Sequence, residues 1–285
     1  MRRAMVLGAL ALAVTARVGG EDAPVKKAVG LSDAEKEVFL ATATVVRTRS
    51  AGGTSGSLRA TLRKDGLEHD AHIQSIDETV PMKALGAGTT EMDFRDSFKG
   101  NLAAYRLDRL LGLGMIPVTV ERSFERKSAS FTWWVDDMLM SELERHDKKI
   151  PAPDPGAWNR QIYVVRIFDQ LIYNYDRNLG NLLVDKRWDI WMIDHTRAFK
   201  VFKPLKNPEN LGTRCPRAFL TALRALDRPS LQQAMKRAIT HGQIGALLAL
   251  RDAIVQYFDQ RIVELGEAVV FYDLPPRVTA PKAPR

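Results

Sequence analysis

The sequence contains a single cysteine, Cys215, among its 285 residues. One thiol cannot close an intramolecular disulfide, so the fold has to rest on its own hydrophobic core and not on cross-links. The chain also has no Cys/His spacing typical of a zinc site and no internal repeat. These absences exclude disulfide-stapled domains, zinc modules and repeat arrays.

Beyond its N-terminus the sequence has no run that is long and apolar enough to span a bilayer. It also lacks a dense run of Lys and Arg interleaved with aromatic residues, although its formal charge is +8 and its pI is about 9.6. This excess favours phosphate-bearing or acidic partners, but a mildly basic globular protein has the same balance. We therefore expect neither a stable membrane span nor nucleic acid as a partner.

The first residues, 1–23, have the pattern of a cleavable signal peptide. Arg2 and Arg3 form a basic start, an apolar run follows over Ala4–Val14, and small residues suited to cleavage lie near Ala16. The run is shorter than a comfortable transmembrane helix, although a membrane anchor and a buried helix remain alternatives. The sequence therefore predicts an exported protein, either periplasmic or extracellular.

The first half of the chain has the pattern of an antiparallel sheet with one inserted helix. The strongest local signal is Asp65-Gly66, which joins two strand-like runs as a hairpin. Ser32 and Glu35 predict a capping box at the start of a short helix. The expected elements are a helix at 33–41, strands at 42–48, 58–64, 67–76, 116–122 and 130–135, a loop at 81–91 and a helix at 93–113.

The second half is richer in helices, and the composition changes near Met140. A long amphipathic helix is expected over 158–172, and a helix-rich region over 217–266. The tail, 275–285, is dominated by Pro, Lys and Arg and is expected to be disordered. The sequence therefore predicts an α+β chain with two compositionally different lobes.

The segment that follows the long predicted helix carries the most chemical information. Asp176 is followed five residues later by Asn181, and a polar turn then separates two apolar segments, 182–184 and 190–193. When paired as antiparallel strands, these segments place Asn181 beside Asp194 at the same end of a hairpin. The three oxygen-bearing side chains are therefore expected to converge on one edge.

Phosphoryl transfer needs this set of groups. A carboxylate has to orient the attacking hydroxyl and accept its proton, and oxygen ligands have to hold Mg²⁺ against the phosphates. An Asp-x4-Asn loop, followed by a hairpin and another Asp, is the arrangement of kinase catalytic loops. We expect Asp176 to be catalytic, and Asn181 and Asp194 to bind the metal. The alternative is an ordinary polar surface turn around Gly180.

These residues resemble the catalytic core of atypical kinases with an Asp-Arg-His-x-x-Asn loop. These kinases are the phosphatidylinositol-kinase-like enzymes, the HipA-type kinases and the secretory-pathway kinases of the Golgi lumen. Residues 176–181 match the loop, and residues 193–199 match the metal-binding Asp-Phe-Gly segment. Residues 102–112 and 116–122 resemble the regulatory helix and following strand of the secretory kinases. The resemblance covers roughly residues 53–199.

The resemblance implies a two-lobed protein-kinase-like fold in an exported bacterial member, with an N-lobe over 30–140 and a C-lobe over 141–274. It also implies ATP as the nucleotide and Mg²⁺, or Mn²⁺, as the metal. The residues after Trp133-Trp134 lie where a kinase hinge is expected, which assigns Met138 to the cofactor site, although the tryptophans themselves are more typical of a core. The turn at Ser50–Gly56 is expected either to cover a nucleotide or to be a flexible connector.

Three residues depart from the family pattern. Gln74 stands where the family has its phosphate-binding Lys, Asn101 stands where it has the partner Glu, and Asn178 replaces the loop His. We expect Gln74 and Asn101 to line the cofactor site, where they could pair as neutral amides. The alternative for Gln74 is an ordinary strand residue. Losing the Lys–Glu pair removes a charge-assisted phosphate contact. The replacement cations to consider are Lys64, Lys83 and Lys99.

Two main functions follow from these residues. The first is an exported kinase-like phosphotransferase that moves the ATP γ-phosphate to a hydroxyl of a protein or a small molecule. The second is a pseudokinase that binds a nucleotide or a protein as a scaffold without efficient transfer. A helical interaction protein with a fortuitous loop is a third possibility.

Overall fold

The computed structural model describes residues 26–28, 30–52, 56–86, 88–174, 176–275 and 277. The predicted signal peptide lies outside these residues, and so does most of the tail that was expected to be disordered. Residues 53–55 of the glycine- and serine-rich turn also lie outside them.

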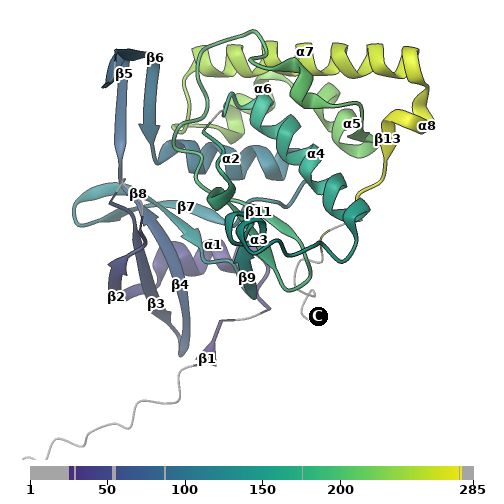
Figure 1. Cartoon of the computed structure of the whole chain (residues 1–285). Helices are drawn as coiled ribbons and strands as arrows, with labels where there is room; N and C mark the ends of the chain where they lie inside the picture. Colours follow the sequence, from purple (N-terminus) through teal and green to yellow (C-terminus); the bar gives the residue numbers. More distant parts are fainter. Residues whose placement is uncertain are drawn as a thin grey trace, which may run out of the picture.

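The N-terminal half folds around a six-stranded sheet with the order β2-β3-β4-β8-β7, and β1 lies parallel to β4 (Figure 1). Asp65 and Gly66 join β3 to β4 with φ of 49° and 73°, as a type I′ hairpin turn requires. The predicted capping box of Ser32 and Glu35 is formed at the start of α1. The elements are β1 (Lys26–Lys27), α1 (Asp33–Thr42), β2 (Thr44–Ser50), β3 (Leu58–Lys64), β4 (Leu67–Gln74), α2 (Lys99–Leu110), β7 (Thr119–Phe124) and β8 (Lys127–Trp133).

A long hairpin of β5 (Asp77–Gly86) and β6 (Thr89–Ser97) stands between β4 and α2. The loop expected over 81–91 is therefore wrong, and the helix expected from residue 93 begins only at Lys99. Pro81 suggested a loop, but both strands of an isolated hairpin are edge strands, where a proline is tolerated. In Figure 1 the hairpin rises from the sheet toward the helical half.

The C-terminal half is mainly helical and carries a small sheet with the order β11-β10-β9. Asp154 caps α4 by accepting from the Ala157 N–H, and Pro155 occupies the first turn, where its missing N–H has no cost. The change of composition near Met140 falls inside β9, which pairs with β10. The elements are β9 (Met138–Ser141), α3 (Glu142–Asp147), α4 (Pro155–Leu171), β10 (Leu182–Asp185), β11 (Ile190–Met192), β12 (Cys215–Pro216), α5 (Arg217–Ala225), α6 (Arg228–Ala234), α7 (His241–Leu265), α8 (Glu267–Val270) and β13 (Phe271–Tyr272).

One continuous core joins the two halves. Phe131 of β8 and Leu107 of α2 belong to the same buried cluster as Phe168 of α4 and Phe258 of α7. None of the helices in the described ranges combines the length and the apolarity that crossing a membrane requires. The chain therefore forms an α+β fold with a sheet-containing N-lobe and a helical C-lobe.

Candidate functional site

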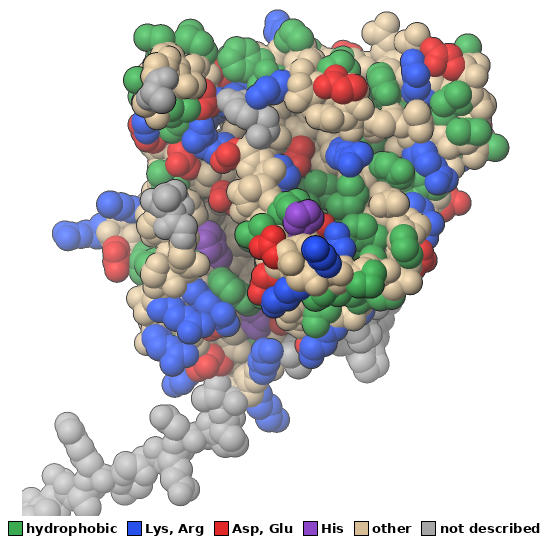
Figure 2. Space-filling view, in the orientation of Figure 1, with side chains coloured by type: hydrophobic (Ala, Val, Ile, Leu, Met, Phe, Trp, Pro, Cys, Tyr) green, Lys and Arg blue, Asp and Glu red, His purple; other side chains and the backbone are tan. Residues whose placement is uncertain are grey.

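A cavity of about 660 Å³ lies between the two lobes. Five of the six predicted site residues line it: Gln74, Asn101, Asp176, Asn181 and Asp194. Figure 2 shows this face of the molecule hollowed between its sheet side and its helical side. Residues from β4, α2, the loop after α4 and the end of the β10–β11 hairpin therefore meet around one space.

The β10–β11 hairpin brings Asn181 next to Asp194. Leu182 pairs with Met192, and the Ile193 N–H donates to the Asn181 carbonyl at 3.1 Å. Asp194 follows with φ of 54°, a left-handed conformation that is uncommon for a non-glycine residue and clusters at functional sites. This arrangement is the one that the apolar pattern of the two strands predicted.

Arg177 ties the loop of Asp176 to this hairpin. Its guanidinium donates to both carboxylate oxygens of Asp169 on α4, from Nε and from Nη2, each at 2.9 Å. Nη1 donates to the backbone carbonyls of Asn181, at 3.1 Å, and Ile193, at 2.6 Å. Bidentate, charge-assisted pairs of this kind are among the strongest hydrogen-bonding arrangements in proteins. Arg177 therefore fixes the loop and both strands relative to α4.

His195 supports the same edge from the core. Its side chain is buried, and its Nε2 lies 3.0 Å from Nη2 of Arg177. Because a guanidinium can only donate, Nε2 has to accept, and the ring is neutral. Burial, reinforced by the charge of Arg177, holds the pKa of His195 well below its usual range.

Helix α2 approaches the Asp194 segment at Gly100. A Cβ at this position would overlap the His195 carbonyl oxygen, so the close approach requires glycine. One residue later, Asn101 Oδ1 accepts from the His195 backbone N–H at 2.8 Å, and Nδ2 donates to Ser130 Oγ at 3.4 Å. Asn101 therefore links α2 to the sheet and to the residue after Asp194.

Gln74 lies on the facing wall, on β4. Its side chain is only 2% exposed, and its Nε2 is buried without a hydrogen-bond partner. The expected amide pair with Asn101 is wrong, because Asn101 makes its hydrogen bonds to His195 and Ser130 instead. A buried donor without a partner costs about 1–3 kcal/mol, and this amide belongs to a residue of the cavity wall.

The residues that line the cavity, as far as the structure describes them, include no Lys and no Arg. The three lysines considered as replacement cations are engaged elsewhere. Lys64 donates to Thr42 Oγ1 at 2.6 Å, Lys83 to Glu78 at 2.6 Å and Lys99 to Asp77 at 2.7 Å. None of the three lines the cavity, so the suggestion that one of them replaces the family's Lys is wrong.

His72 is a cavity residue that the sequence analysis missed. It precedes Gln74 by two positions on β4, so both side chains lie on the same face of the strand, and both line the cavity. Burial lowers the pKa of His72, and the charge of Asp194 opposes this shift. The alternation along β4 was the signal that would have identified this residue.

Met138 does not line the cavity. It pairs with Asp185 at the start of β9 and is 39% exposed. Trp133, Trp134 and Val135 of the preceding segment line the cavity instead. Because β9 turns toward the C-lobe sheet, the chain leaves the cavity wall before it reaches Met138.

Asp176 sits among other acidic groups. Burial raises its pKa, the charge of Arg197 lowers it, and the neighbouring carboxylates of Asp194 and Asp96 raise it again, so that the net shift is upward. A raised pKa brings a carboxylate closer to the range in which it accepts and releases a proton. The raised pKa of Asp176 therefore suits a general base better than it suits a residue of an ordinary surface turn.

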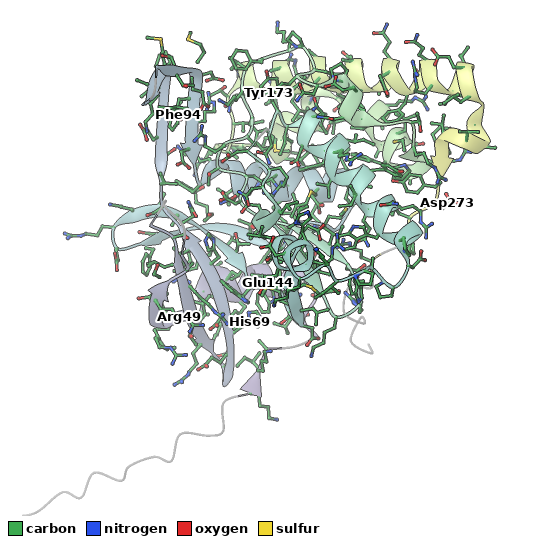
Figure 3. The ribbon with its side chains drawn as sticks, in the orientation of Figure 1. Arg49, His69, Phe94, Glu144, Tyr173 and Asp273 are labelled. Carbon is green, nitrogen blue, oxygen red and sulfur yellow. The ribbon has the colours of Figure 1, made fainter. Side chains whose placement is uncertain are left out.

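The β5–β6 hairpin holds the segment that follows Asp194. Glu91 of β6 accepts from Arg197 and from the buried Lys200, and Asp93 Oδ2 accepts from the Val201 N–H at 2.8 Å. Arg197 also stacks over Phe94, which Figure 3 labels on the hairpin, at 4.4 Å from the ring centroid. These contacts were not predicted, because a loop was expected at Glu91 and a helix from residue 93.

The donor set at the hairpin end suits a hard divalent cation. Within the described part of the chain, no group of three or more His, Cys, Asp and Glu side chains is placed to hold a metal by itself. Mg²⁺ usually takes one or two protein carboxylates and completes its shell with phosphates and water. The oxygen atoms of Asn181 and Asp194 fit this pattern.

Solved structures with a similar architecture include a kinase. A hydra Fam20 solved with a sugar matches with a TM-score of 0.64 at 14% identity, covering 83% of this chain and 91% of that one. The Golgi casein kinase matches with a TM-score of 0.61 at 14% identity, covering 85% of this chain and 78% of that one. Its structure with Mn/ADP bound matches with a TM-score of 0.60 at 14% identity, covering 85% of this chain and 80% of that one. This chain has an atypical protein-kinase-like fold. No family model and no curated protein matches the sequence.

Proposed function

We propose that this chain is an atypical kinase-like phosphotransferase that moves the γ-phosphate of ATP to a hydroxyl of a protein or a small molecule. The observation that carries the proposal is the convergence of Asp176, Asn181 and Asp194 on one edge of the cavity of a kinase-like fold. The acceptor belongs to the class of hydroxyl compounds, whether protein or small molecule.

Each residue has a role in this reaction. Asp176 orients the acceptor hydroxyl and takes its proton as the oxygen attacks phosphorus. Asn181 and Asp194 hold Mg²⁺ or Mn²⁺, which supplies charge compensation for the phosphate oxygens when it is bound. Gln74 donates its free amide N–H from the opposite wall. Arg177 keeps the loop and the hairpin in register without touching the substrate.

Asp176→Asn separates transfer from binding. The substitution keeps the size of the side chain but removes the proton acceptor, so transfer of ³²P from ATP is expected to fall at least about a hundredfold. Nucleotide binding, measured by thermal shift with ATP and Mg²⁺, is expected to stay unchanged. Transfer that survives in Asp176→Asn contradicts the role of Asp176 as the base.

A pseudokinase scaffold is the second candidate. The absence of Lys and Arg from the described cavity lining favours it, because a charge-assisted phosphate contact is missing on the sheet side. Nucleotide binding by the wild-type chain without detectable transfer to itself or to generic hydroxyl acceptors would favour this candidate. Transfer that depends on Asp176 favours the enzyme.

We also propose that the protein is exported. The support is the basic and apolar pattern of residues 1–23. Cell fractionation of the full chain and of a chain without these residues tests the proposal. Export of both forms, or of neither, contradicts it.

A further inference from the structure

A second cavity, of about 390 Å³, lies at the junction of the β5–β6 hairpin with the N-termini of α2 and α7. None of its lining residues lines the cleft described above. Its walls come from both lobes, because the hairpin and α2 belong to the N-lobe and α7 belongs to the C-lobe. The residues used below are Asp77, Arg95, Lys99, Thr196, Arg237 and Thr240.

The cavity is lined by three cationic residues from three separate elements. Arg95 comes from β6, Lys99 from the first turn of α2 and Arg237 from the turn between α6 and α7. The one carboxylate in the lining is Asp77, which accepts from Lys99 at 2.7 Å. The formal charge of these four groups is +2, and Asp93, which is ion-paired with Arg95, lowers it to +1. The cavity therefore still favours an anion.

Two of these cations differ in what they already contact. Arg95 is ion-paired, since its Nε lies 3.3 Å from Asp93 Oδ1, although this buried atom makes no hydrogen bond. Among the described residues, no hydrogen bond or ion pair involves the side chain of Arg237. A ligand with several acceptor oxygens would satisfy such donors, as phosphate and sulfate groups do.

The backbone adds to this character. Helix α7 has 25 residues, and its N-cap, Thr240, and Gln243 of its first turn line the cavity. The N-terminus of a helix carries partial positive charge, which favours anions. This contribution supports the three side chains and does not replace them.

We propose that this junction cavity is an oxyanion site that binds a phosphate- or sulfate-class group, either free or as an ester on a side chain. Two hydrogen bonds connect this cavity to the cleft. The Ser97 N–H donates to the Thr196 carbonyl at 3.0 Å, and Thr196 Oγ1 donates to Asp194 Oδ1 at 3.1 Å. An anion held here bridges the two lobes next to the residue that is proposed to bind metal.

The experiment uses the full chain with inorganic phosphate as the probe. The thermal unfolding midpoint is measured against phosphate concentration at constant ionic strength, with sodium chloride as the balancing salt and no nucleotide. Phosphate is expected to raise Tm. Arg237→Ala and Arg237→Gln are each expected to need about tenfold more phosphate for the same shift, since each removes one charge-assisted contact.

Arg49→Ala is the matched control. Arg49 is an exposed arginine on β2, lies away from the hairpin in Figure 3, and has no side-chain hydrogen bond or ion pair in the described part of the chain. Asp194→Ala reports on phosphate that binds in the cleft instead. A phosphate response that is equal in the wild type, Arg49→Ala and both Arg237 variants overturns the proposal, and so does a response lost only in Asp194→Ala.

Intact-mass measurement separates the two sources of the anion. Stabilisation of a chain that carries no phosphate ester supports a free anion. If the purified chain carries an ester on a cavity hydroxyl, such as that of Thr196 or Thr240, added phosphate should act only after phosphatase treatment. A chain that carries no ester and shows no phosphate response beyond that of chloride contradicts the proposal.

Discussion

The two walls of the cleft are built on different principles. The C-lobe wall holds Asp176, Asn181 and Asp194 in a frame of charge-assisted hydrogen bonds centred on Arg177. On the sheet wall, by contrast, Gln74 has an unpartnered amide and no cation lines the described cavity. The side expected to hold metal is therefore fully supported within the protein, whereas the facing side contains a buried amide donor without a hydrogen-bond partner.

The difference bears on the phosphoryl transfer that we propose. In that proposal the C-lobe wall positions the metal and the acceptor, whereas no Lys or Arg in the described lining compensates phosphate charge from the sheet wall. Gly100 and Asn101 join the two walls, because α2 contacts the residues after Asp194 through them.

Arg177→Ala is expected to have the largest effect on stability. It leaves Asp169 buried without its ionic partner and removes the hydrogen bonds that Arg177 Nη1 donates to the carbonyls of Asn181 and Ile193. Removing one partner of a buried ion pair typically costs about 3–5 kcal/mol, which chemical denaturation would measure. Arg166→Ala, an exposed arginine on α4, is the control and should cost less than about 0.5 kcal/mol. Equal losses in the two variants would show that Arg177 does not organise this wall.

Gly100→Ala tests the junction of the walls. The added methyl group overlaps the His195 carbonyl oxygen, which is backbone and cannot move away cheaply. The expected loss is about 1–3 kcal/mol in the free energy of unfolding, together with weaker nucleotide binding. Gly242→Ala on α7 is the control, since its new Cβ would lie 3.8 Å from Thr240 Oγ1 and is expected to be neutral or slightly stabilising. A neutral Gly100→Ala contradicts the close approach of α2.

Gln74→Lys is expected to have a smaller effect that strengthens the weak wall. A cation at this position adds a charge-assisted contact to the phosphates, so the Kd for ATP with Mg²⁺ should fall about tenfold, or ~1.4 kcal/mol. Gln232→Lys, at an exposed position on α6, makes the same change of charge away from the cleft. Unchanged or weaker ATP binding by Gln74→Lys, measured by calorimetry, would show that this wall does not face the phosphates.

The features that the sequence predicted correctly are local ones. The β10–β11 hairpin follows from two apolar runs and a turn, and it is enough to place Asn181 beside Asp194. The capping box of Ser32 and Glu35 and the turn at Asp65-Gly66 depend on neighbouring residues in the same way. The alternation of side chains along β4 was also enough to predict that His72 lies on the same face as Gln74.

The features that the sequence did not predict depend on distant contacts. Arg177 gains its role only when α4 and the hairpin fold around it, so no local pattern marked it. The Asn101 amide forms hydrogen bonds with Ser130 and with the His195 backbone, which lie 29 and 94 positions away in the sequence. It therefore does not form the expected pair with Gln74. The β5–β6 hairpin was not predicted because Pro81 indicated a loop, although an edge strand tolerates proline where a central strand does not.

The most direct test of the account is the thermal shift of the full chain with ATP, with and without Mg²⁺, in the wild type and in Asp194→Ala. The wild type is expected to show a stabilisation by ATP that needs Mg²⁺, and Asp194→Ala is expected to lose it while unfolding at a similar temperature without ligand. No Mg²⁺-dependent stabilisation of the wild type, or an equal one in Asp194→Ala, would contradict the assignment of the metal-binding edge.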